Sequence, residues 1–210
     1  GAIQQKKKKL IEGTHTAMAV NLERLGVRLV AGNVSGISKA AVHISGHGKD
    51  EAIPYDALIL AIGSRAASFP SLKPDGKAIL GVAPVLDFPE PPESLILVGA
   101  GPIGLELSEV YHRLGSKITL LDAAPNLAPI EDPDVSKVVA QVMREKGIDT
   151  RPGAKVESLV TEGGKAKLSL AGGEVIWAEK ALVAIGRFAM APLPGLEELG
   201  VAFGEPAPRK

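Results

Sequence analysis

Three glycines and one aspartate have a spacing that suits recognition of a pyrophosphate and a ribose. Gly99, Gly101 and Gly104 follow a short apolar run, and Asp122 ends the next apolar run. The first glycine permits a sharp turn, the second lets the backbone approach a pyrophosphate, and the third lets a helix lie close to a sheet. An acid about 20 residues further on accepts hydrogen bonds from the adenosine ribose and repels a 2′-phosphate. No arginine follows Asp122, so we predict a site for NAD(H) rather than NADP(H).

The residues between these glycines complete the predicted turn. Pro102 stands where a first helical turn begins, where its missing N–H costs nothing and the remaining amides can face an anion. The alternative is an ordinary strand, turn and helix without a ligand, because a lone glycine motif is weak evidence. We predict a cofactor-binding turn made by Gly99, Ala100, Gly101, Pro102, Ile103 and Gly104.

The flanking sequence predicts the elements that would position this turn. Apolar residues are continuous over 95–98, recur at helical spacing over 103–114, and are dense again before Asp122. A helix is predicted from Asp132 to Gly147, with an apolar stripe at Val135, Val138, Val139, Val142 and Met143. Strands are then predicted at 155–160, 166–170, 175–177 and 180–187. This order favours an α/β fold with a parallel sheet and a β-meander.

The first part of the chain predicts a helix followed by a smaller meander. The helix spans about 6–25, and its lysine run 6–9 is either a solvated face or a site for an anion or partner. Strands are predicted at 27–30, 34–38, 41–45 and 52–54, with a buried strand at 57–64. His43 and His47 are assigned to a hairpin rather than to a metal site. The proline-rich stretch 69–92 is predicted to cross between domains, and the tail 192–210 has little pattern.

The two parts of the chain resemble each other. Residues 51–63 align without gaps on 174–186, and both end in Ala-Ile-Gly. Upstream, Leu-Gly-Val at 25–27 matches Lys-Gly-Ile at 146–148. The first copy has no glycine turn of its own, so we expect the chain to begin inside a domain.

Composition narrows the possible functions. The chain has 210 residues, which allows one large or two small domains, and a net charge of zero, which indicates neither a nucleic-acid nor a membrane surface. Cysteine is absent, which excludes disulfides, thiolate metal sites and a cysteine nucleophile within this chain. Its absence also fits a reducing compartment, and we expect a cytoplasmic location. The apolar runs are far shorter than the ~18 residues of a membrane span.

Three motifs resemble the flavoprotein pyridine nucleotide-disulfide oxidoreductases, namely GAGPIGLE at 99–106, AIGS at 61–64 and ALVAIGR at 181–187. Asp122 and the acidic run 131–134 are most similar to the dihydrolipoyl dehydrogenase branch. The resemblance implies an FAD/NAD(P)-binding, three-layer ββα Rossmann-like domain, plus an incomplete second copy of the same fold. It assigns 1–66 to the later part of an FAD-binding domain, 67–188 to an NAD-binding domain and 189–210 to the return segment.

Further site residues follow from this resemblance alone. Glu106 matches a carboxylate that reaches the nicotinamide ribose, although a first-turn acid favoured by the helix dipole is the alternative. Val156 and Gly186 match positions whose backbone lines the adenine and nicotinamide ends. The strand end that borders FAD corresponds to Ile62, Gly63 and Ser64, or is simply a strand terminus. No catalytic residue and no metal ligand is assigned.

The resemblance implies a parent enzyme that passes electrons from a dithiol through a disulfide and FAD to NAD⁺. In the dihydrolipoyl dehydrogenase branch the dithiol is dihydrolipoamide, and the parent would be a homodimer within 2-oxoacid dehydrogenase complexes. This chain lacks the redox cysteines, the flavin glycine turn and the His-Glu acid/base pair, so we expect NAD(H) binding without catalysis. The alternatives are a non-enzymatic NADH-binding or redox-sensing module, and a related flavin-dependent NADH oxidoreductase such as a mercuric reductase-like protein. A native module should cover the apolar run 58–62, whereas a fragment should leave it exposed.

Overall fold

A computed structural model describes most of the chain and divides it into two compact units. The first unit contains Gly1–Gln4 and Arg65–Phe188, and the second contains Gln5–Ser64 and Ala189–Lys210. His47 lies outside the described residues, so the predicted hairpin tip is not tested. The described residues are 1–46, 50–67, 69–189 and 193–202.

The first unit is built on a five-stranded parallel sheet. Among its three inner strands, β12 (Lys180–Val183) pairs with β6 (Ser94–Val98), and β6 pairs with β7 (Lys117–Asp122), so that Leu97 lies opposite both Leu182 and Leu120. Strands buried on both faces are typically continuous apolar runs, which explains the sequence pattern. In spatial order the strands are β5 (Ile79–Leu80), β12 (Lys180–Val183), β6 (Ser94–Val98), β7 (Lys117–Asp122) and β8 (Asp149–Pro152).

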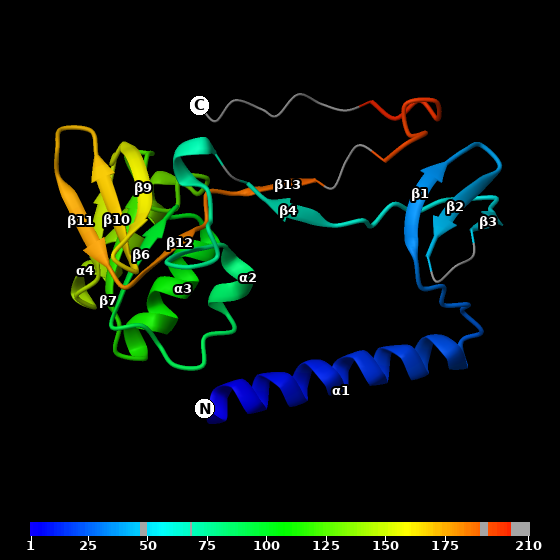
Figure 1. Cartoon of the computed structure of the whole chain (residues 1–210), viewed down its shortest axis with the longest axis horizontal. Coiled ribbons are helices and arrows are strands. Elements are labelled where there is room, and N and C mark those ends of the chain that lie inside the picture. The colour runs from blue at the N-terminus through cyan, green and yellow to red at the C-terminus, as the bar shows by residue number, and fades with distance from the viewer. Residues whose placement is uncertain (47–49, 68, 190–192, 203–210) are drawn as a thin grey trace. The chain divides into compact units, whose positions relative to one another are not determined.

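Two different layers cover this sheet. Leu97 and Leu120 pack into one apolar cluster with residues of α3 (Pro102–Arg113) and α4 (Pro133–Glu145). Ile96 and Leu121 pack into a second cluster with the antiparallel meander β9 (Val156–Glu162), β10 (Lys165–Leu170) and β11 (Val175–Ala178). The meander strands stand together in yellow and orange beside the sheet (Figure 1). The predicted three-layer ββα arrangement with a parallel sheet and a meander is therefore confirmed.

Most predicted elements of the first unit are confirmed, with two corrections. The stripe predicted for α4 is only partly buried, because Met143 is buried whereas Val135 and Val138 are exposed. The prediction that 69–92 is a crossing between domains is wrong. This stretch forms η1 (Pro70–Leu72), β5 and α2 (Val82–Val85) and so belongs to the first unit, because β5 pairs with β12 at the edge of the sheet.

An ion pair joins α3 to the residue that follows α4 and gives a first testable prediction. Glu109 Oε1 lies 2.7 Å from Lys146 Nζ and 2.8 Å from Arg113 Nη2. The hydrogen bond from Lys146, followed by that from Arg113, lowers the pKa of the Glu109 carboxyl. Such a carboxyl stabilises the fold above its unfolded pKa, and this contribution is lost as the pH falls through the folded pKa. We expect Lys146→Ala to raise the pKa of Glu109 in an NMR titration, whereas the exposed-site control Lys137→Ala should leave it unchanged. An unmoved pKa in Lys146→Ala would contradict the assignment.

The second unit contains a three-stranded antiparallel meander, drawn in blue and cyan in Figure 1. Its strands are β1 (Asn33–Ile37), β2 (Ala41–Ser45) and β3 (Glu51–Pro54), close to the predicted ranges. The described residues 193–202 are attached to β1, since Ile37 N–H donates to Pro194 O at 2.9 Å and Leu196 is buried. The helix α1 (Ala2–Arg24) buries none of its residues. The strand predicted at 27–30 is wrong, because these residues are exposed and form no ladder.

The buried strand predicted at 57–64 is also wrong. Residues 57–63 form no strand, and Ile59 is 90% exposed. Only Ser64 continues into a strand, β4 (Ser64–Ala66), which pairs with β13 (Arg187–Ala189). The equivalent run in the repeat becomes β12 because it lies between β5 and β6, whereas among the described residues of the second unit the meander is antiparallel and offers no parallel neighbour.

Candidate dinucleotide site

The predicted glycine turn lies between the end of β6 and the start of α3. Gly99 has φ +112°, and a Cβ there would lie 2.4 Å from the Ala184 carbonyl oxygen. A Cβ on Gly104 would lie 1.8 Å from the Gly99 carbonyl oxygen. Both clashes are with backbone atoms that no side-chain rotation can move. These two glycines therefore let α3 and the end of β12 approach the turn closely.

Gly101 differs from its two neighbours in the motif. Its φ of −76° is allowed for every residue type. No atom lies within 4 Å of the position of its Cβ, apart from its own chain neighbours. Packing within the protein therefore gives no reason for glycine at this position. The open space suits a group that approaches the backbone from outside, as a pyrophosphate does in this kind of turn.

The amino end of α3 leaves donors available beside Gly101. Pro102 is the first helical residue, no side chain of the described part caps this end, and the first turn holds no acidic residue. The leading N–H groups of a helix have no partner within the helix and form the positive end of its dipole. The backbone at Ile103 and Gly104 can therefore receive an anion.

Asp122 lies at the end of β7 and is bound to the turn. Its Oδ2 accepts a hydrogen bond from the Ala100 N–H at 2.6 Å, and its Oδ1 accepts one from the Ala124 N–H at 2.8 Å. The residue is only 8% exposed. A carboxylate has about four acceptor positions, so two remain for ribose hydroxyls. The sequence placed Asp122 near the turn, but it gave no sign of these two backbone contacts.

A second attachment holds the turn from the loop 123–132. Ala128 N–H donates to the Ala100 carbonyl at 2.9 Å. Ala128 O in turn accepts a hydrogen bond from the Ser136 hydroxyl at 3.2 Å, and Ser136 is buried. Ala128 has φ +49°, and among the described residues it is the one non-glycine with a positive φ. Sequence reasoning missed both Ala128 and Ser136.

Three further predicted residues lie on α3, at the start of β9 and after β12. Glu106 is exposed on α3 and follows its first turn, so the alternative of a first-turn acid is not supported. Val156 begins β9, after a connection in which Ala154 N–H donates to Asp122 O at 2.9 Å. Gly186 follows β12 with φ +128°. Their contacts to a nucleotide stay predictions.

The residues predicted to border FAD are Ile62, Gly63 and Ser64. All three are exposed, and they belong to the second unit. Residues 57–63 form no strand and Ser64 begins β4, so the described residues here show no counterpart of the turn between β6 and α3. Their contact with FAD stays a prediction.

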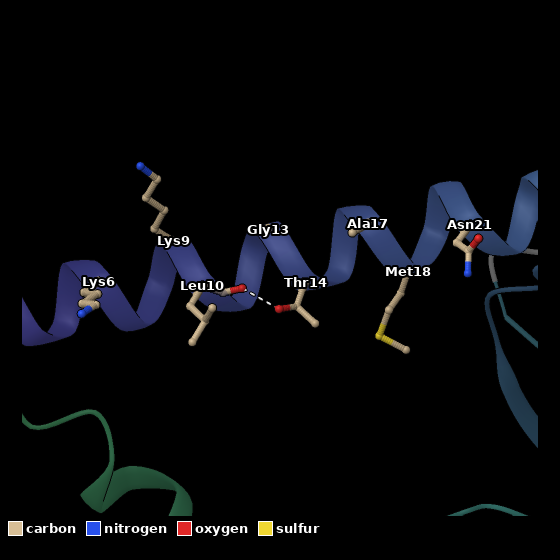
Figure 2. Close-up of a pocket in the computed structure, with 8 residues that line it drawn as sticks. All are labelled: Lys6, Lys9, Leu10, Gly13, Thr14, Ala17, Met18 and Asn21. Atoms are coloured by element: carbon tan, nitrogen blue, oxygen red, sulfur yellow. Dashed lines mark hydrogen bonds between the residues drawn. The ribbon is translucent and has the colours of Figure 1, made fainter.

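Three further features of the described residues bear on other candidate sites. A depression on α1 is lined by residues of that helix alone, as Figure 2 shows for Lys6, Leu10, Thr14 and Met18, so no second element closes it. Across the described ranges no three His, Cys, Asp or Glu side chains are grouped as metal ligands. No helix in the described part of the chain is long and apolar enough to cross a membrane.

Comparison with known families agrees with the geometry of the turn. The family model described as pyridine nucleotide-disulphide oxidoreductase matches residues 4–206. The chain belongs to this oxidoreductase family. Its parallel sheet, its glycine turn and its meander are thus those of a pyridine nucleotide-disulphide oxidoreductase.

Several family members with sequences similar to this chain are dihydrolipoyl dehydrogenases. The chain is 32% identical over 211 residues to the enzyme of Trypanosoma brucei brucei, covering 97% of this chain and 44% of that protein. An enzyme of Bacillus subtilis is 36% identical over 162 residues, which covers 75% of this chain and 34% of that protein. The crystal structure of LpdA from Mycobacterium tuberculosis has a TM-score of 0.87 at 25% identity, covering 97% of this chain and 46% of that one. The chain therefore spans less than half the length of these relatives, whose family uses FAD and NAD.

Proposed function

We propose that the first unit is the NAD(H)-binding domain of an FAD-dependent disulfide oxidoreductase of the dihydrolipoyl dehydrogenase type. The observation that carries this proposal is Gly101, whose missing side chain no packing contact explains. The predicted domain 67–188 lies within the compact unit Arg65–Phe188. The uncapped amino end of α3 supports the same assignment.

In the proposed site, different residues contact different parts of NAD(H). The backbone at Gly101, Ile103 and Gly104 faces the pyrophosphate, and the free acceptor positions of Asp122 take the adenosine ribose hydroxyls. Glu106 accepts from the nicotinamide ribose. The backbone at Val156 lines the adenine end of the site, and that at Gly186 lines the nicotinamide end. NAD⁺ itself, when bound, supplies the hydride-accepting ring, and the chain supplies binding and orientation.

We assign the second unit to part of an FAD-binding domain. The repeat supports this, since 51–63 match 174–186 of the first unit. Most of the apolar run 57–62 is exposed, whereas its counterpart β12 has a neighbouring strand on both edges. This difference supports the proposal that a further polypeptide segment covers the run in the parent protein. The same exposure disfavours a self-contained NADH-sensing module. The described residues of the second unit contain no counterpart of the turn between β6 and α3, so no flavin step is assigned to them.

The proposed parent reaction is the oxidation of dihydrolipoamide by NAD⁺ to lipoamide and NADH. Its first step needs a redox disulfide, and the chain has no cysteine. We therefore propose that the 210 residues bind NAD(H) and do not catalyse the reaction. Assembly of the parent as a cytoplasmic homodimer, within 2-oxoacid dehydrogenase complexes, belongs to the same proposal.

Three measurements on the purified chain test this function. Its visible spectrum should lack a flavin band, fluorescence titration should detect NADH binding, and dihydrolipoamide with NAD⁺ should yield no NADH. NADPH, titrated in parallel, should bind more weakly because Asp122 repels its 2′-phosphate. A flavin band would refute the statement that the flavin site is incomplete. Dihydrolipoamide-dependent NADH formation would refute the absence of catalysis, and a failure to bind NADH would refute the proposed function itself.

A further inference from the structure

The hydroxyl of Ser136 is used in an unusual way for a helical serine. Serine hydroxyls inside helices commonly bond a carbonyl three or four residues earlier. Ser108 on α3 does so, donating to Leu105 O at 2.7 Å. Ser136 on α4 instead donates to Ala128 O, eight residues earlier and outside the helix. The hydroxyl thus ties the loop to α4 rather than completing the helix.

The loop residue that Ser136 holds has a conformation that needs support. Ala128 has φ +49°, where the Cβ of an L-residue crowds the following carbonyl oxygen. Such conformations persist where surrounding contacts over-determine them, and they concentrate at functional sites. Ala128 is 4% exposed, and its neighbour Leu127 is packed into the core with Leu97 and Leu107. The contacts at this position therefore hold the backbone against its local preference.

The backbone N–H of Ala128 contacts the dinucleotide turn. It donates to the Ala100 carbonyl at 2.9 Å. The Ala100 carbonyl and the Gly101 N–H belong to one planar trans peptide and point in opposite directions. Fixing the carbonyl on Ala128 therefore directs the Gly101 N–H away from the loop. Asp122 fixes the preceding peptide through the Ala100 N–H at 2.6 Å.

We propose that Ser136 is a positioning residue for the dinucleotide turn, acting through Ala128 and Ala100 on the direction of the Gly101 N–H. The proposal rests on the function proposed above, since it assumes that this amide faces the pyrophosphate. A turn that is already oriented before binding loses less entropy when the cofactor arrives. The Ala128 carbonyl also accepts a hydrogen bond from the Glu131 N–H at 3.0 Å. Without the Ser136 hydroxyl only this backbone bond holds the carbonyl, so Ala128 leaves its left-handed conformation more readily and releases the Ala100 carbonyl.

A matched pair of buried serines separates positioning from stability. Ser116 is 3% exposed, and its hydroxyl donates to the Pro92 carbonyl at 2.6 Å. It precedes β7, at the amino ends of the strands, and so lies at the opposite end of the sheet from the turn. Ser116→Ala and Ser136→Ala each remove one hydrogen bond from a buried hydroxyl to a backbone carbonyl, but Ser136→Ala alone affects the turn.

The experiment measures NADH affinity and the midpoint of thermal unfolding for both variants of the full chain. Loss of one neutral hydrogen bond corresponds to about threefold to tenfold in an equilibrium constant. We expect Ser136→Ala to raise the Kd for NADH by this factor, Ser116→Ala to leave it unchanged, and Ser136→Thr to restore most of the affinity. Both alanine variants are expected to lower the unfolding midpoint. In the chain without NADH, amide hydrogen exchange at Ala128 should accelerate in Ser136→Ala alone.

The outcomes distinguish this proposal from the proposed function. If the unsubstituted chain fails to bind NADH, the proposed function falls and this proposal falls with it. If the unsubstituted chain binds NADH but Ser136→Ala changes the Kd no more than Ser116→Ala does, the positioning role alone is overturned. Unchanged exchange at Ala128 in Ser136→Ala would also overturn it, because the hydroxyl would then not be holding the loop.

Discussion

Gly101→Ala is expected to leave the fold intact and to weaken NADH binding by about a hundredfold, or ~2.8 kcal/mol. The backbone at this position has φ −76°, and no atom beyond its chain neighbours lies within 4 Å of the new Cβ. Thermal stability should therefore be unchanged or slightly raised, since alanine lowers the conformational entropy of the unfolded chain relative to glycine. The new methyl group would instead occupy the space that we assign to the pyrophosphate.

Gly104→Ala provides the matched comparison for this prediction. It adds the same methyl group only a few residues away, but its Cβ would lie 1.8 Å from the Gly99 carbonyl oxygen. Because α3 must then move away from the turn, the unfolding midpoint should fall together with NADH affinity. Circular dichroism melts and NADH titrations of both variants check the contrast. Binding of NADH by Gly101→Ala as tightly as by the unsubstituted chain would contradict the proposed position of the pyrophosphate.

Asp122→Asn is expected to lower NADH affinity by about tenfold, or ~1.4 kcal/mol, and to narrow the preference for NADH over NADPH. The two carboxylate oxygens accept from the Ala100 and Ala124 N–H groups. An asparagine has one oxygen, so its NH₂ group must face one of these N–H donors. Leaving a buried donor unpaired costs about 1–3 kcal/mol, and the free energy of unfolding should fall accordingly. The lost negative charge also removes the repulsion of a 2′-phosphate.

Asp149→Asn is the control for the change from aspartate to asparagine. Asp149 begins β8 and pairs with Arg151 through a contact of 2.8 Å, with 42% of its side chain exposed. It should leave both the NADH affinity and the NADH to NADPH ratio unchanged. The ratio of the two dissociation constants, measured by fluorescence titration, decides the question. An unchanged ratio in Asp122→Asn would mean that this carboxylate does not select the cofactor.

The first unit could be predicted largely from its own sequence because local pattern and tertiary environment agree there. Residues 95–98 and 181–183 are apolar without interruption, and both runs lie in inner strands with covered faces. The glycine turn between β6 and α3 is local as well, so its position follows from the spacing of its glycines. The α4 stripe was over-predicted, because helical spacing does not tell which valines meet the sheet.

The wrong predictions concern segments whose structure depends on a partner elsewhere in the chain. The run 57–63 has the same apolar character as β12, but no parallel neighbour stands beside it in the described part of the second unit. The stretch 69–92 contains many prolines, which favour a connection, yet Ile79 and Leu80 pair with β12, about 100 residues later along the chain. Propensity describes the segment alone, and pairing depends on what lies beside it.

The sequence predicted those site residues whose type is required by the chemistry of binding. It did not predict the residues that matter only through their backbone geometry or position. Glycines and an acid carry a recognisable spacing, and the contact between Asp122 and Ala100 brings the two parts together. Ala128 and Ser136 carry no such signal. An alanine with a positive φ is uncommon, and a serine at the beginning of a helix has several ordinary explanations.

Backbone amide NMR on titration with NADH tests directly where the cofactor binds. We predict that the largest chemical-shift changes fall on the amides of Gly101, Ile103 and Gly104, with smaller changes at Ala124 beside Asp122. The exposed helix α1 should show none. Saturable changes confined to α1 or to the meander β1–β3, or no change at the glycine turn at saturating NADH, would contradict the account.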